Sequence, residues 1–224
     1  MLRLISANLR HGRADPGAFA ELVRREDAAV VAVQELGPRL TETLGALLPH
    51  GKLEPTPDGM GMGVALRRPA AVERLGLPHR DARVARLAPE NWPELRECVE
   101  ILNVHISAPH TRVPRSWHDR RGQVAGLEAY LATAVGPRAL VGDFNATPAW
   151  PAYRRLTAVL DDAAALVAAR EGRAPARTWG PTPDAPRLLR IDHVLVDALE
   201  VLAFRVVSLP GSDHSAVVVD LACE

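Results

Sequence analysis

Several predicted strands of this sequence end in, or contain, side chains that can bind a cation or move a proton. These side chains are, in chain order, Asn8, Glu35, His105, Asp143, Asn145, Asp192, Asp213 and His214. Taken singly, an Asp or Asn after a strand is usually a turn residue or a helix cap. A single histidine within a strand is usually a hydrogen-bonded core residue. The set indicates chemistry only if the fold gathers it in one place.

Two of the carboxylates lie where the sequence predicts burial. Glu35 directly follows the apolar run VVAVQ, so its charge should be partly removed from water, which is costly without a partner. Asp192 lies inside the apolar stretch RIDHVLV and therefore needs a buried partner or a metal ion. His214 is the candidate partner, because carboxylates commonly fix the tautomer of a working imidazole.

Together these residues could hold a hard divalent cation. Phosphoester hydrolysis needs such a cation to neutralise charge on the phosphate, and carboxylate and amide oxygens are its preferred ligands. We predict that Asn8, Glu35 and Asp213 supply these ligands. An oxygen-rich set suits Mg²⁺, Mn²⁺ or Ca²⁺ better than zinc, and no Cys/His cluster with zinc spacing is present.

The remaining residues could act on water and on the phosphate. Hydrolysis also needs a group that orients or deprotonates water, and donors to the non-bridging oxygens. Asp143 can act on water, while Asn145 and His214 can donate to the phosphate. The sequence has no Walker-type glycine loop and no GxSxG motif, so nucleotide-triphosphate and serine-hydrolase chemistry are disfavoured. The set predicts a phosphoester hydrolase.

The elements that must position these residues alternate between strands and helices at first. The pattern predicts strands over 2–7 and 28–34, and helices over 15–26 and 38–48. Further strands are predicted over 63–67, 72–77, 99–106, 138–142, 188–196, 201–209 and 215–221. A long helix is predicted over 114–135, and Thr147-Pro148 should open another. Residues 78–97 give no clear pattern. This order favours a layered α/β fold in which helices cover the sheets.

Composition limits the classes of protein that remain. The 224 residues fit one large domain or two small ones, and 47% are apolar, which is enough for a sizeable core. Lys+Arg and Asp+Glu are 27 each, so binding of nucleic acid by bulk charge is disfavoured, although a local basic groove is not excluded. Two cysteines cannot form a disulfide framework. No leader and no membrane span is expected, which predicts a cytoplasmic protein with no obligate protein partner.

The sequence resembles the endonuclease/exonuclease/phosphatase superfamily, which includes deoxyribonuclease-like enzymes and other metal-dependent phosphoesterases. The matching blocks follow the family's order along the whole chain: LISANL, VVAVQEL, GVALRR, ILNVHIS, LVGDFNATP, TW, RIDHVLV and SDHSAVVVDL. The resemblance implies a single domain over 1–224. It also implies an α/β four-layer sandwich, in which two mixed β-sheets pack face to face and are flanked by helices.

The resemblance also implies a role for each site residue. Glu35 matches the family's main metal ligand, with Asn8 and Asp213 nearby and Mg²⁺ as the expected ion. Asp143 and Asn145 match the residues that activate water and hold the phosphate.

The resemblance also implies roles for two of the histidines. His214 matches a phosphate-contacting histidine that Asp192 orients. His105 occupies the position of a general acid in deoxyribonuclease-like members, where abasic-site enzymes carry tyrosine. Two positions depart from the family: Ala7 and His193 stand where many members have an aromatic residue. Strand alternation should point His193 away from Asp192, which predicts a structural role for it.

The substrate is less determined than the chemistry. We predict a phosphodiesterase or nuclease acting on nucleic acid, with a phosphatase or phosphodiesterase of a small phosphorylated metabolite as the alternative. The first choice rests on Arg112, Arg115, Trp117, Arg120 and Arg121, which could track a phosphate backbone and offer a stacking face. The plain alternative is the solvated face of a helix. A non-catalytic binding module that retains the fold is disfavoured, because the predicted site set is complete.

Overall fold

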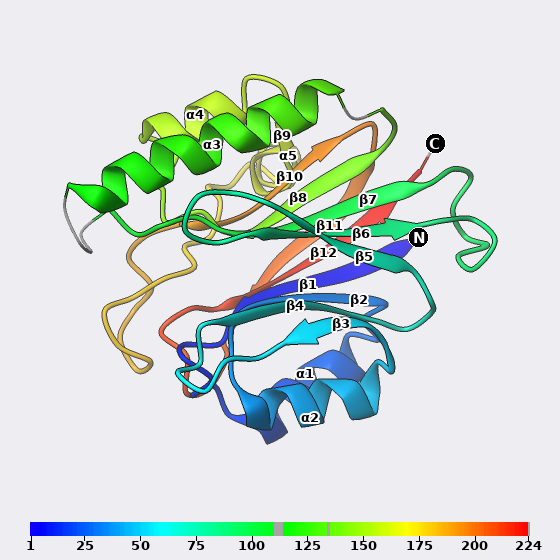
Figure 1. The fold of residues 1–224 in the computed structure, drawn as a ribbon, viewed down its shortest axis with the longest axis horizontal. Coiled ribbons are helices and arrows are strands. Elements are labelled where there is room, and N and C mark those ends of the chain that lie inside the picture. Colours follow the sequence, from blue (N-terminus) through cyan, green and yellow to red (C-terminus); the bar gives the residue numbers. More distant parts are fainter. Residues whose placement is uncertain (110–113, 134, 224) are drawn as a thin grey trace.

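Two six-stranded β-sheets pack face to face at the centre of the computed structural model, which describes residues 1–109, 114–133 and 135–223 (Figure 1). The first sheet contains β1 (Leu2–Asn8), β2 (Val30–Leu36), β3 (His50–Glu54), β4 (Gly61–Leu66), β11 (Glu200–Val207) and β12 (Ala216–Ala222). Its strand order is β11-β12-β1-β2-β4-β3. Because β1 and β2 are parallel and the other pairs are antiparallel, this sheet is mixed.

The second sheet has the order β5-β6-β7-β8-β10-β9. Its strands are β5 (Ala71–Leu75), β6 (Ala82–Leu87), β7 (Val99–His105), β8 (Arg138–Asp143), β9 (Asp161–Asp162) and β10 (Asp192–Asp197). It is mixed as well, because β7 and β8 are parallel. Apolar side chains of both sheets, such as Leu4, Ile101 and Val194, form one core between them.

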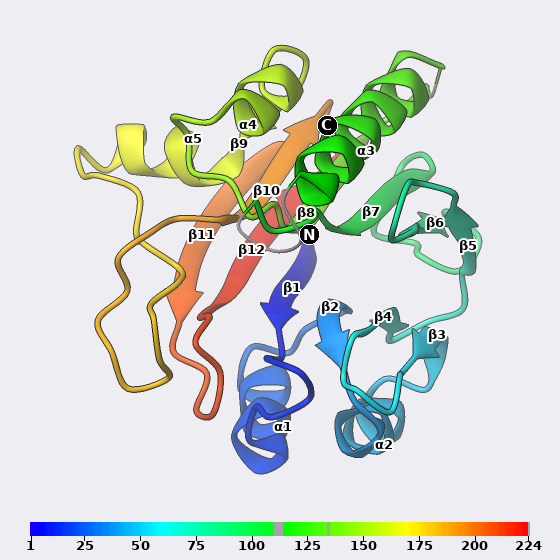
Figure 2. The same cartoon turned by 60° about the vertical axis from the view of Figure 1, so that its left-hand side comes forward.

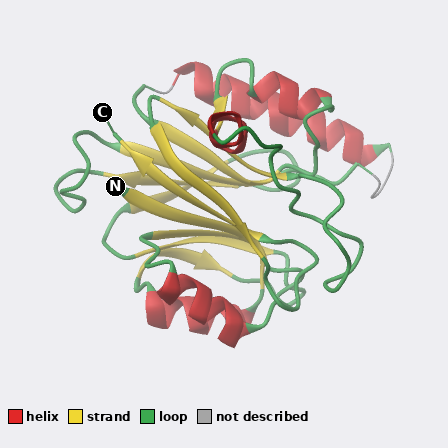
Figure 3. Ribbon diagram, turned by 180° about the vertical axis from the view of Figure 1, so that it is seen from behind, coloured by secondary structure: helices red, strands yellow, loops and turns green. Residues whose placement is uncertain are grey.

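Helices cover the outer faces of both sheets (Figures 2 and 3). Helices α1 (Pro16–Arg25) and α2 (Pro38–Leu47) pack on the first sheet, and α3 (Arg115–Thr133) and α4 (Pro151–Leu156) pack on the second. Helix α5 (Ala163–Arg170) contacts β10 and β11 and contributes Val167 to the core between the sheets. The predicted four-layer sandwich is confirmed. None of the helices described is long and apolar enough to cross a membrane.

Each central strand shares its side chains between two cores, which explains the continuous apolar runs in the sequence. In β1, Leu4 belongs to the core between the sheets and Ile5 to the core under α1 and α2. In β8, Val141 faces the other sheet and Leu140 packs under α3 and α4.

Several predicted elements have different limits in the structure. The strand predicted from residue 188 begins at Asp192, because Leu189 forms only an isolated bridge with Trp179 and the Thr178 hydroxyl accepts the backbone N–H of Ile191 and Asp192. The helix predicted near Thr147 begins at Pro151, after a turn. The long helix is described over Arg115–Thr133, and Ala134 lies outside the described residues.

Four elements were not predicted: β3, β6, β9 and α5. Strand β3 lies at a sheet edge and has no apolar alternation, since its sequence is HGKLE. Strand β6 lies within the region 78–97, where charged residues mask the strand pattern. Helix α5 is composed mostly of alanine and so has no contrast between its faces.

Candidate active site

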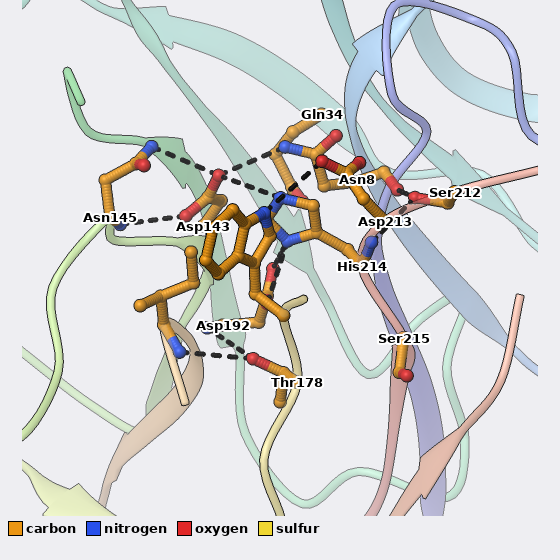
Figure 4. Close-up of polar contacts among 12 residues, drawn as sticks. Asn8, Gln34, Asp143, Asn145, Thr178, Asp192, Ser212, Asp213, His214 and Ser215 are labelled. Carbon is orange, nitrogen blue, oxygen red and sulfur yellow. Dashed lines mark hydrogen bonds and ion pairs between the residues drawn. The ribbon is translucent and has the colours of Figure 1, made fainter. Parts of the chain in front are cut away.

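The polar ends of several strands meet at a pocket of about 830 Å³. The predicted site residues that line it are Glu35, His105, Asp143, Asn145, Asp213 and His214. Asn8 and Asp192 lie directly behind the lining, and each forms hydrogen bonds to lining residues (Figure 4). The structure therefore brings all eight predicted residues together, although their roles stay predictions.

The sheet register explains why these side chains converge. In the parallel pair β7 and β8, His105 is the register partner of Asp143, and in the antiparallel pair β8 and β10, Asp143 is the partner of Asp192. In the first sheet, the parallel pairing of β1 and β2 ends at Asn8, next to Glu35. Face-to-face packing of the two sheets then places both groups at one pocket.

Glu35 leaves the regular ladder of its sheet. Its φ is +54°, and the pairing of β2 with β4 shifts register between Gln34 and Leu36. This bulge turns the Glu35 carboxylate toward the pocket, where Oε2 accepts a hydrogen bond of 2.7 Å from the backbone N–H of His11. A non-glycine residue in the left-handed region is strained, and such strain concentrates at functional sites.

The Asn8 amide lies between two carboxylates. Its Nδ2 donates to Glu35 Oε1 at 3.2 Å and to Asp143 Oδ2 at 3.0 Å, while its Oδ1 accepts the backbone N–H of Arg10 at 2.9 Å. The amide N–H groups thus supply partial positive charge at a point where two carboxylates converge. A divalent cation supplies full charge to such a point, and the Glu35 and Asp143 oxygens are donors that it prefers, whereas Asn8 Oδ1 can become a ligand only when its hydrogen bond from the Arg10 N–H is exchanged. The residues present therefore fit a hard cation beside Glu35.

Asp213 lies at the edge of this region. Its Oδ2 accepts a hydrogen bond of 3.3 Å from the Trp179 indole, and its Oδ1 is 3.7 Å from Nε of Arg10. It lines the pocket, but its hydrogen bonds and ion pairs within the described residues do not include Glu35 or Asn8. Its predicted place in the cation site is therefore less direct than that of Glu35.

Asp143 is buried and carries the most crowded carboxylate of the site. Its Oδ2 accepts hydrogen bonds from the Asn8 amide at 3.0 Å and the Asn145 amide at 3.1 Å, and its Oδ1 accepts the Asn145 backbone N–H at 2.8 Å. Burial raises the pKa of Asp143 to about 7, against the opposing charge of His214, and the nearby carboxylates add to the increase. A carboxylate with such a pKa can accept a proton from water near neutral pH.

Asn145 supports Asp143 more directly than the sequence suggested. Its φ is +47°, a conformation that asparagine tolerates better than most residues. Its Nδ2 donates to Asp143 and, at 3.0 Å, to the carbonyl of Ile106. Because both amide protons are engaged, the predicted phosphate contact requires that one of these hydrogen bonds be exchanged for the phosphate.

His214 and Asp192 form the predicted pair. His214 Nδ1 is 3.0 Å from both carboxylate oxygens of Asp192, and its Nε2 is 3.9 Å from Asp143 Oδ2. Burial alone would lower the pKa of His214, but the charges of Asp192 and Asp143 outweigh it and raise the pKa to about 9. His214 is therefore an imidazolium at neutral pH, with Nε2 available as a charged donor in the pocket.

Asp143, Asp192 and His214 also lie close enough to share a metal ion, since their ligand atoms are within 4.8 Å of one another. In the structure, however, Asp192 and His214 already neutralise each other through a close ion pair. Glu35 has only looser histidine neighbours among the described residues, with His11 Nε2 at 3.6 Å and His105 Nε2 at 3.8 Å, so the Glu35 and Asn8 position is the better match for a metal ion.

His105 is buried, and its surroundings oppose a positive charge. Its Nε2 is 3.5 Å from Asp143 Oδ2 and 3.8 Å from Glu35 Oε1, whereas its buried Nδ1 has no hydrogen-bond partner in the part of the chain that the structure describes. Burial, followed by the charge of Arg80, lowers the pKa of His105 well below its usual value. A general acid must hold a transferable proton, so this environment works against the predicted role unless the bound substrate changes it.

The predicted basic rim is wrong at Arg120. This side chain is only 3% exposed, donates to the Ser107 carbonyl at 2.8 Å and lies 5.5 Å from the centre of the Trp150 ring. It therefore cannot track a phosphate backbone. Arg115 is exposed but lies 4.0 Å from Asp119, one helical turn away, and Arg112 is outside the described residues.

Three supporting residues were not among the predicted catalytic and metal residues. Ser212 donates to the Asn8 carbonyl at 2.8 Å and accepts the backbone N–H of His214 at 3.1 Å, and so joins the cation side to the histidine side. Thr178 fixes the start of β10 through its hydroxyl, and Trp179 contacts Asp213. These three residues lie in the TW and SDH blocks of the sequence, but the sequence does not show which side chains they support.

The fold and the pocket together indicate a class of protein. Two packed mixed sheets bring carboxylates, amides and imidazoles to one pocket, and these groups are suited to phosphoester hydrolysis. The profile of the Endonuclease/Exonuclease/phosphatase family matches residues 5–214, and the chain belongs to this family. Its members are hydrolytic phosphoesterases that generally use divalent metal ions.

Solved structures with the same fold have diverse descriptions. A functionally unknown conserved protein of Enterococcus faecalis has a TM-score of 0.75 and 18% identity, with 100% of both chains covered. The mannosyl-6-phosphatase of Bacteroides thetaiotaomicron has a TM-score of 0.73 and 17% identity, covering 99% of this chain and 100% of that one. The human Nocturnin catalytic domain with bound sulfate has a TM-score of 0.72 and 19% identity, covering 99% and 94%. No curated protein sequence matches this chain significantly.

Proposed function

We propose that this protein is a divalent-metal-dependent phosphoester hydrolase in which water attacks phosphorus, the ester P–O bond breaks and the substrate's alcohol group leaves. The observation that supports this most is the convergence of Glu35, Asn8 and Asp143 with the Asp192–His214 ion pair at one pocket. This pocket combines candidates for a cation site, a base and a charged donor.

Each residue contributes a distinct step to the proposed mechanism. Glu35 and Asn8 would hold Mg²⁺, or Mn²⁺ or Ca²⁺ in its place, with Asp213 at the edge of the site. Such an ion, when bound, neutralises charge on the phosphate. Asp143, with its raised pKa, accepts the proton of the attacking water. His214 donates from Nε2 to a non-bridging oxygen while Asp192 holds Nδ1.

A small phosphorylated molecule is the substrate class that the pocket supports best. A volume of about 830 Å³ suits a compact ligand. Among the described residues, the lining contains one arginine, Arg80, and two further carboxylates, Asp58 and Asp119. A polyanionic strand would be repelled by Asp58, and by Asp119 to a lesser extent because Arg115 lies 4.0 Å from it. A mannosyl-6-phosphatase is among the solved structures with this fold, which supports this choice.

A nucleic-acid phosphodiesterase is the second candidate, and one feature favours it. The rings of Trp117 and Trp150 stack with centroids 6.0 Å apart, Trp150 lines the pocket and Trp117 is 42% exposed. An exposed aromatic face beside a phosphate site can stack a base. The loss of Arg120 from the rim makes this the weaker choice.

An activity panel with Mg²⁺ and Mn²⁺ tests both candidates. The substrates are p-nitrophenyl phosphate, bis-p-nitrophenyl phosphate, sugar phosphates, plasmid DNA, single-stranded oligonucleotides and RNA. We expect hydrolysis that chelation abolishes and that Glu35→Gln reduces at least about 100-fold, since this variant removes a charged ligand. Glu21→Gln, on the exposed side of α1, is the control. No hydrolysis of any substrate with either metal would overturn the proposal.

A further inference from the structure

Among the residues that the structure describes, Arg80 is the one arginine that lines the pocket, and no hydrogen-bond or ion-pair partner of its guanidinium is found among them. It is half-buried in the turn between β5 and β6. Its backbone N–H donates to the Pro78 carbonyl, but no hydrogen bond or ion pair of its side chain occurs within the described residues. By contrast, the buried Arg120 and Arg83 each donate to carbonyl groups. A guanidinium that is partly removed from water without a partner has unused donors.

The turn that carries Arg80 is fixed against α3. Gly122 and Gly126 lie one helical turn apart, and a Cβ at these positions would come within 2.9 Å of Pro78 Cγ and 2.6 Å of Leu77 Cδ2. The turn therefore packs closely against the backbone of α3, where larger side chains would displace it. This contact holds Arg80 at the pocket wall before any ligand binds.

Gln123 connects this turn to the strand that carries His105. Its side chain is 1% exposed, its Nε2 donates to the Arg80 carbonyl at 3.5 Å, and its Oε1 accepts the backbone N–H of Ser107 at 2.9 Å. One buried side chain thus sets the position of the Arg80 turn relative to the residues that follow His105. The Arg80 guanidinium is placed on the His105 side of the pocket, where its charge acts on His105, Glu35 and Asp143.

We infer that Arg80 is a phosphate-binding residue, whose guanidinium donates to a non-bridging oxygen of the substrate phosphoryl group opposite His214. The statement that the bound group belongs to a substrate rests on the proposed function. Binding of a phosphate anion by Arg80 does not depend on that function. A guanidinium presents a planar pair of donors that matches two phosphate oxygens. The plain alternative is that Arg80 acts only as a distant counter-charge for Glu35, Asp143 and Asp58.

Binding of inorganic phosphate in Mg²⁺, measured by calorimetry, tests the inference without turnover. We expect Arg80→Gln to raise the Kd for phosphate about 10- to 100-fold, the range for loss of a charged hydrogen bond. Arg80→Lys should recover only part, because it keeps the charge but loses the paired donors. Arg39→Gln, on the exposed face of α2, is the matched control and should leave the Kd unchanged. Thermal unfolding verifies that each variant is folded.

Each outcome bears on one proposal. A folded Arg80→Gln protein with an unchanged Kd, or a wild-type protein that binds no phosphate at millimolar concentration, overturns the inference. Full recovery by Arg80→Lys also overturns it, because charge alone would then suffice. Wild-type protein that binds phosphate through Arg80 but hydrolyses nothing in the activity panel refutes the proposed function and leaves the binding role intact. If the enzyme is active but Arg80→Gln changes neither its KM nor its Kd for phosphate, the binding role of Arg80 is refuted and the proposed function stands.

Discussion

Two buried histidines, His193 and His214, lie on opposite faces of β10, and at neutral pH the first is neutral and the second is positively charged. Asp192 and His193 are consecutive residues, so strand alternation sends them to opposite faces of the sheet. Asp192 holds His214 on the pocket side, and His214 has a pKa of about 9. His193 is equally buried on the other side, and its pKa falls to about 4. Burial lowers the pKa of both histidines, and the charge of the neighbouring side chain determines whether the final pKa is high or low.

The partner of His193 is a cation instead of a carboxylate. Arg190 Nη1 lies 3.3 Å from His193 Nδ1 and 2.5 Å from Asp162 Oδ2, so the guanidinium lies between them. With Nδ1 facing this donor, Nε2 carries the proton and donates to the Ala146 carbonyl at 2.8 Å. The predicted structural position of His193 agrees with these contacts, which support the loop of Asn145 from behind.

The comparison shows how one strand separates chemistry from support. On the pocket side, an imidazolium faces a phosphate site with its Nε2. On the helix side, a neutral imidazole between Phe144 and Tyr153 holds a backbone carbonyl. Changes on the pocket side should mainly affect turnover, and changes on the helix side should mainly affect stability. Four experiments test this division.

The largest effect is expected at His214. His214→Ala removes a charged donor to the phosphate, so kcat/KM should fall about 10³-fold, the upper range for a single transition-state donor. Asp192→Asn should cause a similar loss because Nδ1 is no longer held by a carboxylate. Steady-state kinetics on bis-p-nitrophenyl phosphate measure both variants, and His50→Ala on the exposed strand β3 is the control. A loss below 10-fold at His214 would remove it from the reaction.

The next effect is a pH dependence of stability that differs in sign between the histidines. His193 has a folded pKa of about 4, below its unfolded value of 6.5, so its contribution is present above pH 6.5 and is lost as pH falls toward 4. The size is on the order of 3 kcal/mol. His214 has a raised folded pKa, so its contribution is present below pH 6.5 and is lost as pH rises toward 9.

Urea unfolding with chelator present measures this difference for wild type, His193→Gln and His214→Gln. The free-energy difference between wild type and His193→Gln should shrink as pH falls from 6.5 to 4. The difference for His214→Gln should shrink as pH rises from 6.5 to 9. Equal pH dependence in all three proteins would show that the two environments do not differ as the structure indicates.

A smaller effect is expected at His105, whose environment resembles that of His193 in opposing charge. If His105 protonates the leaving group, His105→Ala should lower turnover about 100-fold on esters with a poor leaving group. The loss should nearly vanish on p-nitrophenyl esters, because p-nitrophenolate leaves without a proton. Equal losses on both kinds of ester would refute the general-acid role and leave a positioning role for His105.

The smallest effect is expected behind the sheet. Tyr153 donates to Asp162 Oδ2 at 2.5 Å, so Tyr153→Phe removes one buried hydrogen bond and should cost about 1 kcal/mol of unfolding free energy. Turnover should change less than about two-fold, since the network contacts the loop and not the pocket. A large loss of turnover with unchanged stability would contradict the division between the two sides of β10.

Much of the fold and the gathering of the site could be predicted from local sequence. The apolar runs of β1, β2 and β8 predict strands that are buried on both faces. The polar residues directly after these runs indicate the polar end of each sheet. Glu35 and Asp143 are such residues. The ordered blocks then placed the chain in its family, and with it the two-sheet architecture that no single block specifies.

Some features that depend on distant partners were not predicted, although the Asp192–His214 pair was. The start of β10 depends on the Thr178 hydroxyl, which lies 14 residues away in the chain. The burial of Arg120 depends on how α3 rotates against Ser107 and Trp150, and the sequence of α3 is too polar to show that rotation.

The sequence by itself determined which groups are available for chemistry and at which strand ends they occur, because strand periodicity is a local property of the chain. Only the tertiary structure decided their charge states and directions. His193 and His214 are the same residue type and equally buried, and one is neutral while the other is charged. The pKa of a buried group depends on the charges within a few ångströms, and packing of distant segments places those charges.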